Sequence, residues 1–515
     1  MQPQFDALRH GGIMSQTLIN IIFGMKVRQS RVDAGMTLTE FARQCELSPS
    51  YVTEIEKGRK YPRADKIMKM AETLDKSYDD LVSIRLDPSL KYLESTLSSA
   101  VIQRFPFEEF GVEPGDLINL LTRQPDKASA LLHAILELIR RFDLEEEDFL
   151  RAALRSYQEI YENYFPDIEE AAIHFTKEFG QQYALNGEQP IQLSTLETIL
   201  QEVYGYEIDD STITTIESLN SYRSIFSQGK RPKLFINSRL YSRQVKFILA
   251  RELGYQFLSL SERSYTSPPE RIDSFAQLLN DFKAAYFGGA LLMPRKRFLQ
   301  DLQTFFTLPS WDAKQFVNML NIYNVTPEML LYRFSELIPQ FFGVKLHFLR
   351  FHHTAAATSY QLVKQLNMNQ LLVPSGIGLF EHYCRRWLSV RLLQEIEIKG
   401  IPKNVDEMPV SVQMSEFLES QDKFLCMGFS RQMVLNPEIR SSVIVGFRVD
   451  ANLKHTIQFM NDPEIPQVLI SETCERCPLT ADQCHLRAAD PTILQAQRRK
   501  LERKLALNQL KEHYQ

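Results

Sequence analysis

Two helix starts lie close together near the beginning of the sequence, and they limit its local fold more than any other feature. At the first, Thr37 can cap the first helical turn and Glu40 completes a capping box. At the second, Ser48 provides the cap and Pro49 takes the first helical position, where its missing N–H costs nothing. Gly58 can end this second helix because glycine readily adopts the left-handed conformation. The pattern predicts two short helices joined by a tight turn.

Further helices are expected on both sides of this pair, which gives a five-helix bundle over residues 23–85. On the second helix of the pair, Val52 and Ile55 are expected to face the core. A later helix carries apolar residues at the spacing of one helical face. These residues are Ile67, Met70, Ala71 and Leu74.

The outer side of the helix pair carries polar and basic side chains that a DNA groove and its phosphates can accept. The expected contact residues on the pair are Thr37, Thr39, Ser48, Ser50, Tyr51, Thr53, Glu54 and Lys57. The expected phosphate-binding residues are Lys26, Arg28, Arg59 and Lys60, with Arg31 and Arg63 nearby. The whole chain has a formal charge of −5, so any charge that binds DNA must be local.

The same segment resembles the Cro/cI-type (XRE) helix-turn-helix family. The resemblance rests on the order Ala42, Leu47-Ser48, Val52, Ile55-Glu56-Lys57-Gly58 and Pro62. It implies a recognition helix that enters the major groove of a double-stranded operator. It also implies a homodimer that reads half-sites about 34 Å apart.

Later segments indicate further domains. Residues 1–22 lack a strong pattern and are expected to form an arm, and residues 86–165 are expected to be a helical connector. An apolar stripe in the connector makes it a candidate for dimerisation; it consists of Leu131, Leu132, Ile135, Leu136 and Ile139. No apolar run approaches the roughly 20 residues of a membrane span, and no leader peptide is evident, so we expect a cytoplasmic protein without membrane contact.

Within residues 166–343, a predicted strand leads into a helix. The strand is Lys233-Leu234-Phe235-Ile236-Asn237, and the helix contains Arg251-Glu252-Leu253-Gly254-Tyr255. This arrangement resembles the ImmA/IrrE metallopeptidase family, whose helix bears H-E-x-x-H. Zinc in such a site needs imidazoles at i and i+4, but these positions hold Arg251 and Tyr255 here. Asp281 falls where the resemblance implies an acidic third ligand.

We therefore expect a zincin-like α+β domain that has lost its zinc ligands and has no catalytic residues. Arg251 is expected to pair with Glu252 or Asp281 in the space that a metal would fill. This domain would hold its neighbours in place or offer its old cleft to a ligand.

Residues 344–515 are expected to form an α+β sensor domain, with strands near 344–351, 423–429 and 443–449 and a final basic helix that covers the domain. Three of the six cysteines crowd into one loop, at Cys474, Cys477 and Cys484. Such spacing suits an iron–sulfur cluster, with zinc or free redox-active thiols as alternatives. A fourth ligand would come from Cys384, Cys426 or His485.

The order of these parts is similar to the short-chain fatty acyl-CoA regulator family, which implies an acyl-CoA ligand and an iron–sulfur cluster that tunes the response. The sequence thus predicts a multidomain protein, mainly α with α+β parts, that regulates transcription in response to a metabolite or redox signal. Two rivals stay open. One is an ImmA/IrrE-type metallopeptidase, and the other is an antitoxin-like repressor.

Overall fold

The computed structural model describes residues 16–83, 109, 146–187, 189–355, 357–369, 381–400 and 407–513. The chain divides into two compact units. The first consists of Met1–Tyr157 and Asp273–Phe275, and the second of Gln158–Ile272 and Ala276–Gln515. Within the described ranges, none of the helices combines the length and the apolar character that a membrane crossing requires.

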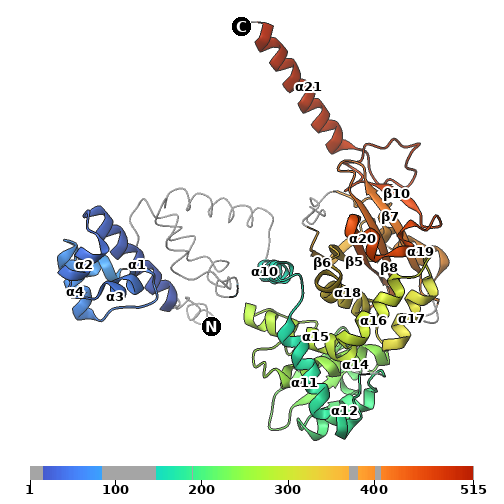
Figure 1. Cartoon of the computed structure of the whole chain (residues 1–515), viewed down its shortest axis with the longest axis horizontal. Coiled ribbons are helices and arrows are strands. Elements are labelled where there is room, and N and C mark those ends of the chain that lie inside the picture. Colours follow the sequence, from blue (N-terminus) through green and yellow to red (C-terminus); the bar gives the residue numbers. More distant parts are fainter. Residues whose placement is uncertain are drawn as a thin grey trace, which may run out of the picture. The chain divides into compact units, whose positions relative to one another are not determined.

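The first unit contains the predicted five-helix bundle (Figure 1). Its helices are α1 (Gln16–Asp33), α2 (Leu38–Gln44), α3 (Pro49–Glu56), α4 (Ala64–Thr73) and α5 (Tyr78–Val82). The predicted core residues Val52, Ile55 and Ile67 are buried there together with Phe23 and Phe41. Burial of these apolar side chains is the main stabilising contribution, because helices this short are marginal alone.

One predicted boundary differs in this unit. The helix α1 begins at Gln16, inside the segment 1–22 where an arm is expected, because Ile22 and Phe23 are already buried. The apolar stripe from Leu131 to Ile139 lies outside the described residues. Of the expected connector, the structure describes chiefly α10 (Glu146–Ile160) and the residues that follow it.

The second unit begins with a helical part around a small sheet (Figure 1). Its helices are α11 (Pro166–Tyr183), α12 (Leu193–Glu202), α13 (Thr212–Thr215), η3 (Glu217–Leu219), α14 (Ser242–Phe257), α15 (Phe275–Leu292), α16 (Arg295–Phe306), α17 (Ala313–Tyr323) and α18 (Pro327–Phe342). Its strands are β1 (Glu207–Asp209), β2 (Ser224–Ser227), β3 (Lys233–Ile236) and β4 (Thr266–Ser267), in the order β1-β3-β2-β4. The strand β3 and the helix α14 confirm the predicted strand–helix pair.

A six-stranded sheet follows, in the order β10-β7-β8-β9-β5-β6. The strands are β5 (Leu346–Thr354), β6 (Gln361–Asn367), β7 (Val410–Phe417), β8 (Lys423–Gln432), β9 (Ile439–Arg448) and β10 (Gln467–Ile470). The strands β5, β8 and β9 confirm the three strands predicted from the sequence. Other elements here are α19 (Leu388–Lys399), α20 (Ala451–Thr456) and η5 (Gln458–Asn461).

Helices cover both faces of this sheet. The helix α19 packs on one face, against Leu349, Cys426 and Ile444, and α18 packs on β5 and β9. Tyr332 of α18 meets Phe348 of β5 edge to face, with ring centroids 5.5 Å apart. The central strands are therefore buried on both sides, which is why they are apolar at consecutive positions rather than alternate ones.

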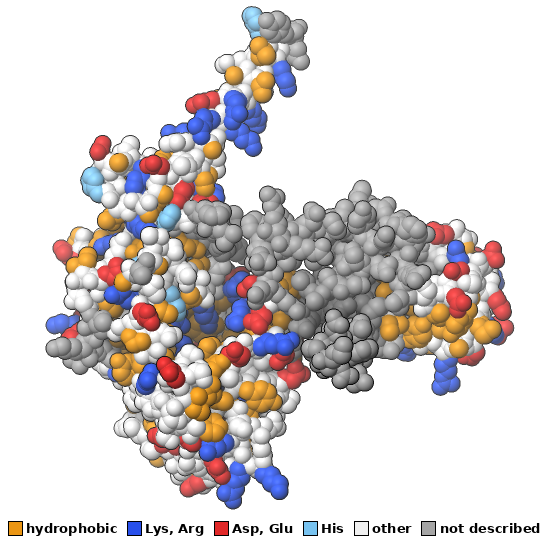
Figure 2. Space-filling view, turned by 180° about the vertical axis from the view of Figure 1, so that it is seen from behind, with side chains coloured by type: hydrophobic (Ala, Val, Ile, Leu, Met, Phe, Trp, Pro, Cys, Tyr) orange, Lys and Arg blue, Asp and Glu red, His pale blue; other side chains and the backbone are white. Residues whose placement is uncertain are grey.

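The last helix, α21 (Thr492–His513), has no buried residue. The expectation that it covers the sensor domain is therefore wrong for the described structure. Its apolar residues do not gather on one face, so it has no stripe to bury against the sheet. Figure 2 shows Lys and Arg side chains gathered along this helix.

Candidate functional site

The predicted caps of the helix pair form as expected. The Thr37 hydroxyl accepts a hydrogen bond from the Glu40 N–H, and the Glu40 carboxylate accepts one from the Thr37 N–H. The Ser48 hydroxyl accepts from the Tyr51 N–H at 3.2 Å, and Pro49 occupies the first turn of α3. Gly58 has φ of 68°, the left-handed conformation predicted for the end of α3.

The helix α3 is held against α1 by a close backbone approach and an ion pair. A Cβ at Gly24 would lie 2.3 Å from the Ile55 carbonyl oxygen, so only glycine fits there. Arg31 donates to both carboxylate oxygens of Glu56, at 2.6 and 3.0 Å, and to the Met36 carbonyl oxygen. Arg31 therefore anchors α1 to α3, which differs from the phosphate contact expected from its sequence position.

The predicted DNA-contacting residues lie on or beside the helix pair. Those that are exposed are Thr37, Thr39, Ser48, Ser50, Arg59 and Lys60. Those that are half-buried are Lys26, Arg28, Tyr51, Thr53, Glu54 and Lys57.

Several of these side chains also make contacts within the bundle. Lys26 donates to the carbonyl oxygens of Asp80 and Ser83, at the carboxyl end of α5. A cation is favoured there by the helix dipole, so Lys26 has a structural role in this conformation. Arg59 pairs with Glu54 at 3.1 Å.

One basic residue near α3 is absent from the sequence-based set. The Lys66 ammonium lies 4.4 Å from the centroid of the Tyr51 ring, closer than Lys60 at 5.8 Å. A cation over an aromatic face fixes the direction of both side chains. The spacing of Tyr51 and Lys66 along the chain gives no sign of this contact, because they belong to different helices.

In the second unit, the positions of the missing zinc ligands lie on α14. Arg251 and Tyr255 are one helical turn apart, and Glu252 between them is fully buried. Asp281 lies on the neighbouring helix α15. The structure therefore brings together the four residues that the sequence singles out.

Glu252 pairs with a residue that the sequence analysis misses. Arg263 donates to both carboxylate oxygens of Glu252, at 2.7 and 2.8 Å, and its guanidinium lies 3.8 Å from the Tyr255 and Phe226 ring centroids. Burial opposes the charge of Arg263, but Glu252 raises the pKa of this guanidinium above its ordinary value. The Tyr206 hydroxyl also donates to Glu252.

The predicted pairing of Arg251 with Glu252 is present only as a long ion pair, and the alternative pairing with Asp281 does not form. The closest approach of Arg251 to Glu252 is 3.9 Å, and its hydrogen bonds go to the hydroxyls of Ser267 and Ser224. Asp281 instead accepts hydrogen bonds from Tyr255 and from the backbone and hydroxyl of Ser264. Arg263 takes the carboxylate because its bidentate geometry matches both oxygens.

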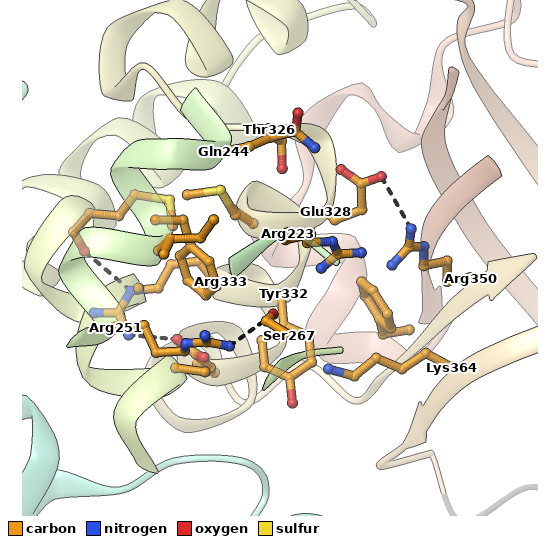
Figure 3. A pocket seen from close by; sticks show the side chains of 18 of the residues that line it. Arg223, Gln244, Arg251, Ser267, Thr326, Glu328, Tyr332, Arg333, Arg350 and Lys364 are labelled. Atoms are coloured by element: carbon orange, nitrogen blue, oxygen red, sulfur yellow. Dashed lines mark hydrogen bonds and ion pairs between the residues drawn. The ribbon is translucent and has the colours of Figure 1, made fainter. Parts of the chain in front are cut away.

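A cavity of about 230 Å³ opens beside Arg251, between α14 and the six-stranded sheet (Figure 3). Arg223 and Arg251 enter it from the small sheet and α14, whereas Arg350 and Lys364 enter from β5 and β6. Part of its wall is apolar and includes Phe247. Basic and apolar side chains thus line one partly open cavity.

The cysteine loop is tied to the segment that precedes α19. The Cys474 N–H donates to the His382 carbonyl oxygen at 2.9 Å, and the Cys384 N–H donates to the Glu472 carbonyl oxygen. This places the Cys384 thiol beside the loop. Burial raises the pKa of Cys384 to about 11, and the nearby thiols of Cys474 and Cys477 contribute.

The remaining candidate ligands differ in position. Burial raises the pKa of Cys477, and Cys484 and Cys474 act in the same direction. Cys426 lies on β8 in the core beneath α19, where burial raises its pKa to about 12 and a hydrogen bond from Ser415 opposes this shift. His485 is exposed. Among the described residues, no three His, Cys, Asp or Glu side chains stand close enough to hold a single metal ion.

Comparison with known families identifies two segments. The family described as helix-turn-helix matches residues 27–81, and the IrrE N-terminal-like domain matches residues 212–335. The control protein C.BamHI of Bacillus amyloliquefaciens is 34% identical over 65 residues, which is 12% of this chain and 80% of the control protein.

Two solved structures are also similar. A Mycobacterium tuberculosis transcriptional regulator has 16% identity and a TM-score of 0.45, covering 66% of this chain and 93% of its own. The apo form of the competence regulator ComR from Streptococcus vestibularis has 14% identity and a TM-score of 0.12, covering 62% and 91%. Both TM-scores lie below 0.5, so neither likeness bears on function.

Proposed function

Because this chain belongs to the helix-turn-helix family through its N-terminal residues and also carries an IrrE-like domain, we propose that it is a transcription regulator that binds a specific operator and responds to a signal through its second unit. The observation that carries the proposal is α3. Its N-terminal half is capped by Ser48 and presents Ser50 and Tyr51, and Arg59 and Lys60 follow its end. This arrangement suits base contacts from the helix and phosphate contacts from the residues beyond it.

In this proposal, the regulator acts as a homodimer in the cytoplasm. A dimer would place two copies of α3 in successive major grooves, about 34 Å apart. A signal then needs only to change the spacing or orientation of the two copies, which is the coupling that allostery requires.

The signal is an acyl-CoA-like metabolite or a redox change at the cysteine loop. The spacing of Cys474, Cys477 and Cys484 supports the loop as the place of an iron–sulfur cluster. Cys384 lies near enough to Cys474 and Cys477 to be the fourth ligand, although in the described structure these thiols are not arranged around a single ion. Zinc bound by the same thiols is the alternative. A bound cluster would supply a reversible change of charge. The buried Cys426 is not needed in this set.

The IrrE-like domain has no peptidase activity in this proposal. Arg263 neutralises Glu252, the residue that would act as general base, and Arg251 and Tyr255 stand where the zinc ligands would be. The alternative functions are a metallopeptidase and an antitoxin-like repressor.

Operator binding tests the proposal. The full chain would first be used to select an operator from a random DNA library. Arg59→Ala and Lys60→Ala are expected to weaken binding to all sequences and to reduce its salt dependence, whereas Tyr51→Ala is expected to change sequence preference. Arg239→Ala, an exposed change in the other unit, is the control and should leave both properties unchanged.

Three results would contradict parts of the proposal. Failure to select any operator would exclude sequence-specific regulation. Equal effects of Arg59→Ala and Tyr51→Ala would contradict the division between phosphate and base contacts. Zinc-dependent proteolysis by the unmodified chain would establish the metallopeptidase instead.

A further inference from the structure

The cavity beside Arg251 carries more positive charge than its own carboxylates neutralise. Its lining includes six cations and two carboxylates. Arg333 is already satisfied, since it pairs with Glu169 at 2.6 Å and with Glu336 at 2.8 Å. Five cations remain, and Glu328 is the one other carboxylate in the lining; Glu336 also attracts Lys364, and Glu252 lies 3.9 Å from Arg251. The five cations are Arg223, Arg251, Arg350, Lys364 and Arg431.

Glu328 already pairs with two arginines of the six-stranded sheet. It accepts from Arg431 at 2.8 Å and lies 3.9 Å from Arg350. Burial opposes its ionisation, but Arg431 and Arg350 hold the pKa of Glu328 at about 2, so it is ionised near neutral pH. One carboxylate therefore pairs with two arginines, and it also attracts Arg223, without forming a hydrogen bond to it.

Arg223 shows this excess most clearly. None of the described residues accepts a hydrogen bond from its guanidinium, which lies in the cavity (Figure 3). Burial lowers the pKa of Arg223 to about 10, and repulsion by Arg350, Arg431 and Arg251 adds to this effect. Arg223 is half-buried by its exposed area, so a ligand that accepts its hydrogen bonds would replace only partial hydration and would be favoured.

The two cations that the strands β5 and β6 contribute also repel each other. Arg350 of β5 and Lys364 of β6 are direct cross-strand partners. Like charges at such positions are destabilising. Arg350 donates to the Ser441 hydroxyl, and the Lys364 ammonium lies 3.8 Å from the Tyr332 ring centroid. Neither of these contacts supplies a negative charge.

Arg251 belongs both to the cavity lining and to the altered peptidase motif. It stands where the resembled metallopeptidases have their first zinc-binding histidine. Its two hydrogen bonds go to the neutral hydroxyls of Ser267 and Ser224, and its Nε is buried without a partner. The change from histidine to arginine thus exchanges a metal ligand for an anion-binding group at the edge of this cavity.

We propose that this cavity binds a small organic anion, a carboxylate or phosphate ester with a short apolar group, whose charged end bridges Arg223 and Arg251 to Arg350 and Lys364. The apolar end lies against Phe247, Met293 and Phe348. The cavity volume of about 230 Å³ matches a small group. Because Arg223 and Arg251 belong to the IrrE-like part and Arg350 and Lys364 to the six-stranded sheet, the anion draws the IrrE-like part and the sensor part together. This inference rests on the proposed function and refines it, since a small organic anion takes the place of an acyl-CoA as the metabolite signal.

Calorimetric titration of the full chain without DNA tests the site directly. The probes are butyl phosphate, butyrate, inorganic phosphate and butanol. Butyl phosphate or butyrate is expected to bind at one site per chain, at least tenfold more tightly than inorganic phosphate, and the tighter of the two identifies the charged end. Butanol is expected not to bind. If neither butyl phosphate nor butyrate binds, the proposal is wrong.

Arg223→Gln provides a second readout. It is expected to weaken binding at least tenfold and to raise the thermal unfolding midpoint of the ligand-free protein, because it removes a repelled cation. Arg239→Gln, an exposed arginine of the same domain, is the matched control and should change neither. A lower midpoint for Arg223→Gln with unchanged binding would assign Arg223 a purely structural role and overturn the site.

Phe247→Ala separates the two ends of the ligand. It should reduce the preference for butyl phosphate over inorganic phosphate while leaving the affinity for inorganic phosphate unchanged. Operator binding, measured separately, distinguishes the two proposals. If the chain binds its operator but no probe, only the anion site fails, whereas probe binding without any operator would leave the site and remove the regulator.

Discussion

Arg263 and Glu252 form a bidentate ion pair in the core of the IrrE-like domain, with N–O distances of 2.7 and 2.8 Å. Glu252 is fully buried, so its charge depends on this partner. Arg263 comes from the loop that follows α14 and packs between the Phe226 and Tyr255 rings. There it neutralises the buried carboxylate and so stabilises the fold of the domain.

Removal of Arg263 should destabilise the second unit. Arg263→Leu is expected to lower its free energy of unfolding by about 3–5 kcal/mol, because it leaves a buried carboxylate unpaired. Trp311 and Trp387 are the chain's two tryptophans, and both belong to the second unit, so urea denaturation followed by tryptophan fluorescence reports on that unit.

The double variant Arg263→Leu with Glu252→Leu serves as the comparison for this pair. It should recover much of the lost stability, because no buried charge remains. Arg239→Leu, at an exposed arginine, should have little effect. An Arg263→Leu variant as stable as the unmodified chain would show that the ion pair does not support the fold.

The contact between α1 and α3 should tolerate no side chain at Gly24. Gly24→Ala places a methyl group 2.3 Å from the Ile55 carbonyl oxygen, so the helices must separate. We expect a loss of about 1–3 kcal/mol in the first unit. Hydrogen exchange should show less protection in α1 and α3 and no change in α14.

Ser30→Ala, on the same helix, is the matched control for Gly24→Ala, because alanine favours helix and the site is only half-buried. Unchanged exchange in α3 of the Gly24→Ala variant would mean that the two backbones do not approach as closely as described.

Acid should weaken the second unit through His347. Burial lowers the pKa of His347 from 6.5 to about 4, so the folded protein keeps this ring neutral while the unfolded chain takes up a proton. The contribution of the neutral His347 ring to the free energy of unfolding is therefore fully present above about pH 6.5. It is lost as the pH drops toward 4, by about 3 kcal/mol in total. Urea denaturation followed by tryptophan fluorescence across this range measures the loss.

His347→Gln should flatten this pH dependence. Part of the slope should remain, because the pKa of His352 is also lowered to about 4, chiefly by burial and by Arg350. His485→Gln, at an exposed position, should leave the profile unchanged. A profile that is the same with and without His347 would contradict the assignment.

The cysteines should divide into two groups. If the loop holds an iron–sulfur cluster, Cys384→Ser and Cys477→Ser should each remove iron, sulfide and visible absorbance from anaerobically purified protein, because both thiols belong to the ligand set. Cys426→Ser should retain them, because this thiol lies in the core and its one hydrogen bond comes from Ser415.

Two other results are informative for the cysteine loop. Retention of the cluster in Cys384→Ser, together with its loss in Cys426→Ser, would mean that Cys426, and not Cys384, is the fourth ligand. A colourless protein that holds stoichiometric zinc would favour the zinc alternative and give the loop a structural role.

The sequence by itself determines the features that depend on neighbouring residues. The capping boxes and stops around α2 and α3 are local hydrogen bonds and backbone conformations, so Thr37, Glu40, Ser48 and Gly58 were sufficient to place these helices. The same holds for β3 and α14, whose residue pattern also shows that the imidazoles needed for zinc are absent. Local signals specify local structure because the interacting groups are close in the chain.

Only the tertiary structure decides which distant side chains meet. Glu252 forms its close, bidentate pair with Arg263, whereas its neighbour Arg251 comes only within 3.9 Å, since the loop after α14 folds back and brings Arg263 to both carboxylate oxygens. Arg223, Arg350 and Arg431 lie far apart in sequence, yet they face one cavity. No periodicity encodes such a meeting, because it arises from the packing of two sheets and the helices between them.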